Sequence, residues 1–211
     1  MKINVCSLVA LSLAGVFLTA PARAATLYSN SAINGQIGGY GLYGGNAVSD
    51  TFTLSGPWTI LSVTFGEWVD PGLTPQTVDW EIGSSAFGSD LGSATSVSLT
   101  SSLFCSHTGC GDGTYDVYAS SFTLDLQLAA GTYWLTLQNA TTSAGLVFWD
   151  QNDGPSQAQI TCCGSVGTNS NSFEVDGTVP EPGSIVLGAS GLLLLLAAGL
   201  RRRRRRVNVS P

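Results

Sequence analysis

Residues 77–82 read Thr-Val-Asp-Trp-Glu-Ile, and apolar and acidic side chains alternate from Val78 onward. Successive side chains of a β-strand point to opposite faces, so the apolar side chains share one face while Asp79 and Glu81 share the other. The stretch predicts a strand with one face in an apolar core and the other toward solvent.

Residues 121–128 and 131–139 repeat this alternation, with Phe122 and Leu135 on the apolar faces. The link between the two stretches is short, so we expect them to be hairpin partners. Further strands are predicted for residues 47–54, 58–68, 95–104, 114–119, 145–149 and 172–176.

Along residues 58–68 the apolar positions change parity between Ile60 and Leu61, which predicts a β-bulge. No convincing 3.6-residue apolar period occurs in the body of the chain. About ten short strands separated by turn signals predict an all-β domain over residues 25–177, a two-sheet antiparallel sandwich of jelly-roll-like type.

The N-terminus has the three parts of a secretory signal peptide. Lys2 provides a positive start, residues 8–18 are apolar, and Ala22-Arg23-Ala24 is a small-x-small cleavage pattern. We expect residues 1–24 to pass through the Sec translocon as a signal peptide, which signal peptidase then removes before Ala25.

The C-terminal region predicts a single transmembrane helix. Residues 185–200 form an uncharged apolar run of sixteen residues, just short of the roughly 20 of a comfortable span. Residues 201–206 are all arginine, and arginines beside a membrane segment stay cytoplasmic. The β domain is therefore expected outside the membrane, with residues 207–211 as a short cytoplasmic tail.

The body from Ala25 to Val179 contains thirteen Asp and Glu residues and no Lys or Arg, a formal charge of −13. The net charge of −6 for the whole chain conceals this imbalance. Such a body repels phosphate backbones, which excludes nucleic acid as a partner. Cations and basic surfaces are the charged partners that it favours.

Four cysteines lie in the exported body: Cys105, Cys110, Cys162 and Cys163. An even number in an oxidising compartment favours disulfides. We expect Cys105 to pair with Cys110 across a small loop, and cross-pairing between the two clusters is the alternative. A zinc site formed by the four sulfurs and His107 would lack the usual ligand spacing.

Catalytic motifs are scarce in the body. His107 is the single histidine, and no Gly-x-Ser-x-Gly motif occurs. We interpret His107 as a surface loop residue and the protein as a non-enzyme. Asp79 and Glu81 offer the alternative of a glycoside hydrolase with paired carboxylates, but alternating acids on a solvent face also serve solubility.

Asp150, Asn152 and Asp153 concentrate oxygen donors in one turn, the ligand chemistry that Ca²⁺ prefers. We expect no cofactor, and calcium is the alternative. The glycine of this turn, Gly154, comes one position too early for an EF-hand loop, and an Asp-Gly hairpin turn explains the same residues.

Trp134 lies on the face of its predicted strand opposite to Tyr133, Leu135 and Leu137, between two threonines. An exposed aromatic ring flanked by hydroxyls is typical of a stacking platform for sugars. The alternative is that a loop covers the ring.

The motif Val179-Pro180-Glu181-Pro182, followed by the apolar run and the arginine cluster, resembles the PEP-CTERM sorting signal over residues 178–206. The resemblance implies a Gram-negative bacterium and temporary anchoring in its inner membrane. It also implies processing by an exosortase, a membrane-embedded cysteine transpeptidase-like enzyme, which would recognise Pro180, Glu181 and Pro182. Proteins with this signal are associated with the cell surface and the exopolysaccharide matrix.

These features together predict an exported, exosortase-processed protein of the cell surface or extracellular matrix. Its β domain is expected to be a non-catalytic structural or binding module associated with exopolysaccharide. A secreted glycan-active hydrolase and a calcium-stabilised envelope module are the alternatives.

Overall fold

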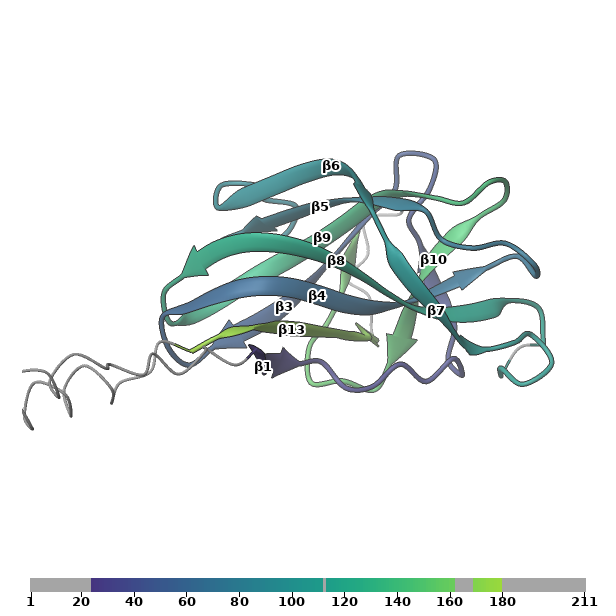
Figure 1. Cartoon of the computed structure of the whole chain (residues 1–211), viewed down its shortest axis with the longest axis horizontal. Helices are drawn as coiled ribbons and strands as arrows, with labels where there is room; N and C mark the ends of the chain where they lie inside the picture. Colours follow the sequence, from purple (N-terminus) through teal and green to yellow (C-terminus); the bar gives the residue numbers. More distant parts are fainter. Residues whose placement is uncertain (1–23, 112, 162–168, 180–211) are drawn as a thin grey trace, which may run out of the picture. The chain divides into compact units, whose positions relative to one another are not determined.

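Every regular element in the part of the chain that the structure describes is a β-strand (Figure 1). The computed structural model describes residues 24–111, 113–161 and 169–179, which contain 13 strands and no helix. These residues belong to one compact unit, Arg23–Val179. The predicted all-β class is confirmed.

The larger sheet has eight antiparallel strands among the described residues, arranged around one long strand, β4 (Trp58–Val69). On one side β8 (Asp116–Leu128) pairs with the whole of β4. On the other side β13 (Phe173–Thr178) pairs with the first part of β4 and β10 (Val147–Asn152) with its end. The sheet is completed by β1 (Ala24–Ser29), β2 (Gly39–Gly41), β7 (Thr100–Cys105) and β12 (Ser170–Asn171).

The smaller sheet has five antiparallel strands in the order β11-β3-β9-β5-β6. Its central strand is β9 (Gly131–Thr141), which pairs with β3 on one side and β5 on the other. The other members are β3 (Ala47–Leu54), β5 (Thr77–Gly83), β6 (Gly92–Ser98) and β11 (Gln159–Ile160).

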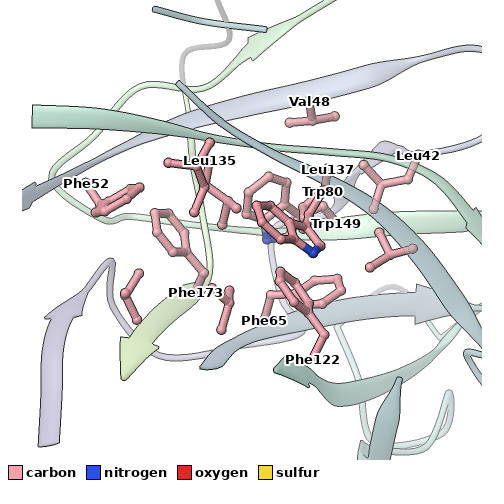
Figure 2. Close-up of a cluster of buried hydrophobic side chains, with 14 of the residues drawn as sticks. Leu42, Val48, Phe52, Phe65, Trp80, Phe122, Leu135, Leu137, Trp149 and Phe173 are labelled. Carbon is pink, nitrogen blue, oxygen red and sulfur yellow. The ribbon is translucent and has the colours of Figure 1, made fainter. Parts of the chain in front are cut away.

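The inward faces of the two sheets form one apolar core (Figure 2). Trp80 of β5 stacks on Phe122 of β8, with ring centroids 6.0 Å apart and 11° between the ring planes. Phe52 of β3 meets Phe173 of β13 edge-on at 6.5 Å. Because rings from different sheets touch, the sheets pack face to face as a sandwich. The predicted inward face of residues 77–82 is confirmed.

The bulge predicted in β4 is present. Against β13, Ile60 pairs with Gly177 and Ser62 with the adjacent Asp176, so Leu61 is the extra residue of β4. On the other side of β4 the register with β8 shifts at the same place. Ile60 and Val63 are fully buried, whereas Leu61 is only half-buried. The bulge therefore lets both halves of β4 turn their apolar side chains toward the core.

The prediction that residues 121–128 and 131–139 form a hairpin is wrong. β8 pairs with β4 and β7, whereas β9 pairs with β3 and β5, so the link at Ala129 and Ala130 crosses between the sheets. Each strand has one apolar face, and in a sandwich two such faces are buried by pointing at each other. The alternating pattern identifies a strand without identifying its partner.

Residues 95–104, predicted as one strand, divide between the sheets. β6 pairs with β5, β7 pairs with β8, and Leu99 lies between the two strands. Conversely, residues 114–119 and 121–128 belong to one continuous strand, β8, apart from the first two residues. Val97 and Leu99 continue the period-two alternation through the change of sheet, so the sequence pattern does not mark it.

The predicted terminal segments lie outside the described residues. They are residues 1–23 of the expected signal peptide, the motif Pro180, Glu181 and Pro182, and the apolar and arginine runs that follow it. Within the described residues, no helix has the length and apolar character needed to cross a membrane.

Candidate functional site

Trp134 lies on the outer face of the five-stranded sheet, in its central strand β9. Leu135 and Leu137 on the same strand are fully buried in the core, and the alternation of β9 places Trp134 on the opposite face. The Trp134 side chain is half-buried and belongs to neither apolar cluster of the described residues. Directly across from it are Thr51 on β3 and Gly83 on β5.

Threonines flank Trp134 on the side where β9 begins. Thr53 on β3 and Thr132 on β9 are exposed, and their Oγ1 atoms share a hydrogen bond of 2.9 Å. Thr51 is half-buried and lies opposite the ring. We call Trp134, Thr51, Thr53 and Thr132 the platform. Because all four residues lie on paired strands, the backbone beneath the platform is held by the sheet's hydrogen bonds.

The turn between β5 and β6, residues 84–91, borders the platform where β9 continues. The Phe87 amide donates a hydrogen bond to Ser49 Oγ at 3.3 Å, and the Thr136 hydroxyl donates to the same oxygen at 2.9 Å. Ser49 and Thr136 are buried although they lie on the outer face of the sheet. The turn therefore covers this part of the face and, because it packs on Gly83 directly across from Trp134, forms a wall beside the ring.

The wall is tied down by short-range contacts. The amide and hydroxyl of Ser84 donate to the two carboxylate oxygens of Asp90 at 3.0 and 2.9 Å, and these bonds lower the pKa of Asp90. A Cβ on Gly83 would lie 2.3 Å from the carbonyl oxygen of Gly88, so only glycine lets the turn pack this closely. Phe87 has a φ of 59°, a left-handed conformation that side chains disfavour.

Asp79 and Glu81 lie on the outer face of β5, farther from Trp134 along the strand. Asp79 accepts hydrogen bonds from the Ser96 amide at 2.6 Å and the Asn139 side chain at 2.8 Å. Glu81 accepts one from the Gln138 side chain at 3.2 Å. Each of the two carboxylates considered for hydrolysis is thus bonded to a neighbouring strand.

The three calcium candidates do not point into one site. Asp150 and Asn152 are fully buried, whereas Asp153 is exposed. Asn152 binds the protein itself, because its Oδ1 accepts from the Gly154 amide at 3.0 Å and the Ser170 hydroxyl at 2.8 Å. Within the described ranges, no three His, Cys, Asp or Glu side chains gather as a metal site requires.

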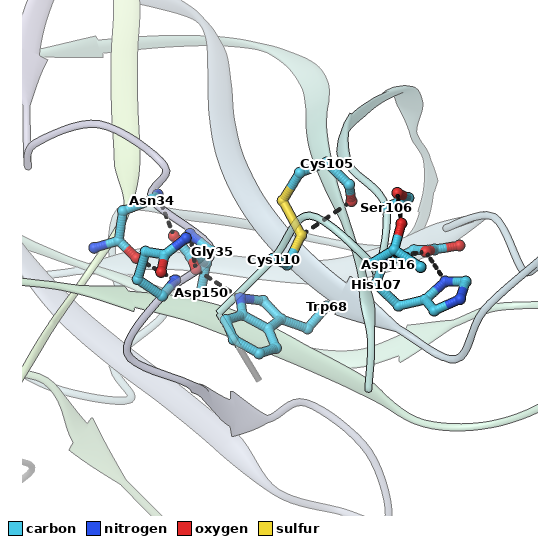
Figure 3. The surroundings of a disulfide bond; sticks show 11 residues. Asn34, Gly35, Trp68, Cys105, Ser106, His107, Cys110, Asp116 and Asp150 are labelled. Carbon is cyan, nitrogen blue, oxygen red and sulfur yellow. Dashed lines mark hydrogen bonds and ion pairs between the residues drawn. A yellow bond between two sulfur atoms is a disulfide. The ribbon is translucent and has the colours of Figure 1, made fainter. Parts of the chain in front are cut away.

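Asp150 instead secures a loop to the outer face of the eight-stranded sheet (Figure 3). Its Oδ1 accepts hydrogen bonds from the Trp68 indole at 2.6 Å and the Gly35 amide at 3.2 Å. Its Oδ2 accepts from the Asn34 amide at 3.2 Å. Burial raises the pKa of the Asp150 carboxyl, and these hydrogen bonds offset only part of that effect.

The expected disulfide between Cys105 and Cys110 is present beside this loop, with the two Cα atoms 5.8 Å apart (Figure 3). Cys162 and Cys163 lie outside the described residues. His107 lies between the two bonded cysteines on a surface loop, with 42% of its side chain exposed and its Nδ1 2.9 Å from an Asp116 oxygen.

The sequence analysis missed two carboxyl groups that are fully buried. Asp50 on β3 accepts hydrogen bonds from the Thr51 and Asn171 amides at 2.7 and 2.8 Å, and burial raises its pKa. Glu67 on β4 is fully buried, its oxygens have no hydrogen bond of standard geometry, and the neighbouring Ser120 hydroxyl offsets only part of the effect of burial on its pKa. Burial raises the pKa of Glu67 to about 8. The alternation along β4 could have predicted the burial of Glu67, since Glu67 lies two residues after the inward-facing Phe65.

No protein-family model matches the chain, and no curated protein matches its sequence. The interpretation of the site therefore depends on its geometry.

Proposed function

We propose that this protein is exported to the cell surface or extracellular matrix, where its β domain binds exopolysaccharide without cleaving it. The observation that carries the proposal is Trp134, a half-buried ring on the outer face of a paired strand, beside threonine hydroxyls. An aromatic ring stacks on the apolar face of a sugar while nearby hydroxyls bond its oxygens. A site on strands also loses little freedom on binding.

Retention on exopolysaccharide purified from the producing cells tests this role. Trp134→Ala is expected to weaken retention in affinity electrophoresis at least about tenfold, which corresponds to roughly 1.4 kcal/mol of lost stacking and burial. Phe104→Ala is the matched control, because Phe104 is 50% exposed on β7 of the other sheet. Equal retention of the wild type and Trp134→Ala, or no retention of either, would overturn the role.

The proposed route to the surface depends on the resemblance to the PEP-CTERM signal. It comprises Sec translocation, removal of residues 1–24, anchoring in the inner membrane by residues 185–200, and processing by an exosortase at the Pro-Glu-Pro motif. Mass spectrometry of the mature protein is expected to find an end near residues 180–183 and no arginine cluster. An intact C-terminus in cells that contain the exosortase would count against this route.

Nested strand pairing supports a jelly-roll-like sandwich as the carrier of this binding role. The pair β3–β9 encloses the pair β4–β8 in the sequence, and the members of each pair lie in the same sheet. Jelly-roll sandwiches include lectin domains, although a fold alone assigns no activity.

A further inference from the structure

The electrostatic surroundings of the platform are entirely negative. No Lys or Arg lies between residues 24 and 179, and thirteen acids do. The wall contributes Asp90, which is exposed and whose pKa is lowered by its bonds to Ser84. Glu81 lies one alternation along β5 from Gly83, the residue opposite Trp134. An anionic group brought to Trp134 would therefore approach fixed negative charges with no cation to compensate.

The hydrogen-bonding groups of the platform match an uncharged ligand. Thr51, Thr53 and Thr132 present hydroxyls, each of which both donates and accepts, as sugar hydroxyls do. Recognition of a carboxylate or sulfate typically uses arginine, lysine or converging backbone amides. The platform has threonine hydroxyls, and the described body has neither arginine nor lysine.

The wall restricts where a chain of sugars can lie. It covers Ser49 and Thr136 and packs against Gly83, so a glycan stacked on Trp134 cannot continue along the strands in that direction. The free directions lead over Thr51 and over the exposed pair Thr53 and Thr132. Contacts beyond the stacked sugar therefore come from hydroxyl side chains.

We infer that the platform takes an uncharged glycan chain and rejects anionic polysaccharides such as polyuronates. This inference depends on the proposed function, since it assigns the ligand class of the same site. Anionic polysaccharides are rejected by charge repulsion. This repulsion is strongest at low ionic strength, because the Debye screening length is roughly 30 Å at 0.01 M salt.

The full chain is tested by affinity electrophoresis against two sets of probes at 0.01 M salt with a chelator. The uncharged set is cellulose oligosaccharides, β-1,3-glucan and dextran, and the anionic set is alginate and polygalacturonate. At least one uncharged glycan is expected to bind at least tenfold more tightly than either anionic probe. Raising the salt to 0.5 M is expected to narrow that gap.

Two variants tie the result to the platform. Trp134→Ala is expected to weaken binding of the uncharged glycan at least tenfold. Thr51→Val is expected to weaken binding of the uncharged glycan severalfold while keeping the β-branched shape that suits a strand. This second variant still tests the platform if Trp134→Ala folds poorly. The control Phe104→Ala should bind as the wild type does.

The failures are distinguishable. If alginate binds as tightly as the best uncharged glycan and loses binding in Trp134→Ala, the ligand class is wrong while the proposed function stands. Alginate binding that appears only with added Ca²⁺ also overturns the ligand class, because a cation then bridges the two negative partners. If neither probe set nor the producing cells' exopolysaccharide binds, both the inference and the proposed function fail.

Discussion

Glu67→Gln is expected to stabilise the fold at neutral pH. Glu67 is fully buried on the inward side of β4, its cross-strand neighbours are Tyr118 and Trp149, and no lysine or arginine exists in the body to compensate its charge. The neighbouring Ser120 hydroxyl offsets only part of the effect of burial on the Glu67 pKa. Glutamine has the same shape and cannot ionise, so the substitution removes the charge while keeping the volume.

The size of the effect follows from the shift in pKa. The Glu67 pKa rises from 4.5 to about 8 on folding, so below pH 4.5 both states are protonated and the group has no effect. As the pH rises from 4.5 to 8 the unfolded state loses its proton and the folded state keeps it, which destabilises the fold. The cost is about 3 kcal/mol at pH 7 and about 5 kcal/mol above pH 8.

Urea unfolding from pH 4 to pH 9, followed by tryptophan fluorescence, measures this effect. All five tryptophans lie between residues 58 and 149, so the signal reports on the β domain. The gain in Glu67→Gln should be near zero at pH 4 and grow with pH, while Asp125→Asn, at an exposed position of β8, should show no such growth. Asp50 and Asp150 titrate in both proteins and cancel. Parallel stability curves for the wild type and Glu67→Gln would refute the reasoning.

Three further outcomes are expected in the same unfolding assay. The free energy of unfolding of the double variant Cys105→Ser and Cys110→Ser should be about 2 kcal/mol lower than that of the oxidised wild type, since the crosslink closes a short loop in the unfolded chain. The variant should be as stable as the wild type treated with reductant. Equal stability of the variant and the oxidised wild type would contradict the role of the bond. Ser96→Gly should gain up to about 1 kcal/mol by relieving a φ of 52° at an exposed position, and a loss would show that this backbone is not strained. Gly83→Ala should lower the free energy of unfolding by about 1–3 kcal/mol and weaken glycan retention, because its methyl group would displace the wall. Gly109→Ala is the control, since its methyl group would meet nothing closer than 3.6 Å. Equal stability and retention of the two variants would refute the close contact at Gly83.

Local alternation was enough to find most strands and their inward faces. Residues 47–54 coincide with β3, and the parity change at Leu61 identified the bulge of β4 against β13. Strand pairing was harder to predict. Two consecutive strands that each have one apolar face can bury those faces either as neighbours in one sheet or as members of two facing sheets. The link at Ala129 and Ala130 is compatible with both arrangements, and the hairpin prediction chose the wrong one.

The candidate site shows the same division. The alternation along β9 placed Trp134 on the outer face, but the wall beside it depends on the contact between Gly83 and Gly88 and on the hydrogen bond from Phe87 to Ser49. These contacts join segments that carry no common pattern. The turn at Asp150 is rich in oxygen donors, and the sequence pattern did not indicate that the Asp150 carboxylate is buried and bonded within the fold.

The sequence by itself determined the all-β class, the inward faces of the main strands and the absence of basic residues from the body, because these depend on residue type and period-two spacing. The resemblance of residues 178–206 to a sorting signal likewise depends on sequence alone. Only the tertiary structure decided which strands pair, how far Trp134 is covered, and that Asp50, Glu67 and Asp150 are buried. Those properties depend on which distant segments come into contact, and burial rather than residue type then sets the pKa of each acid.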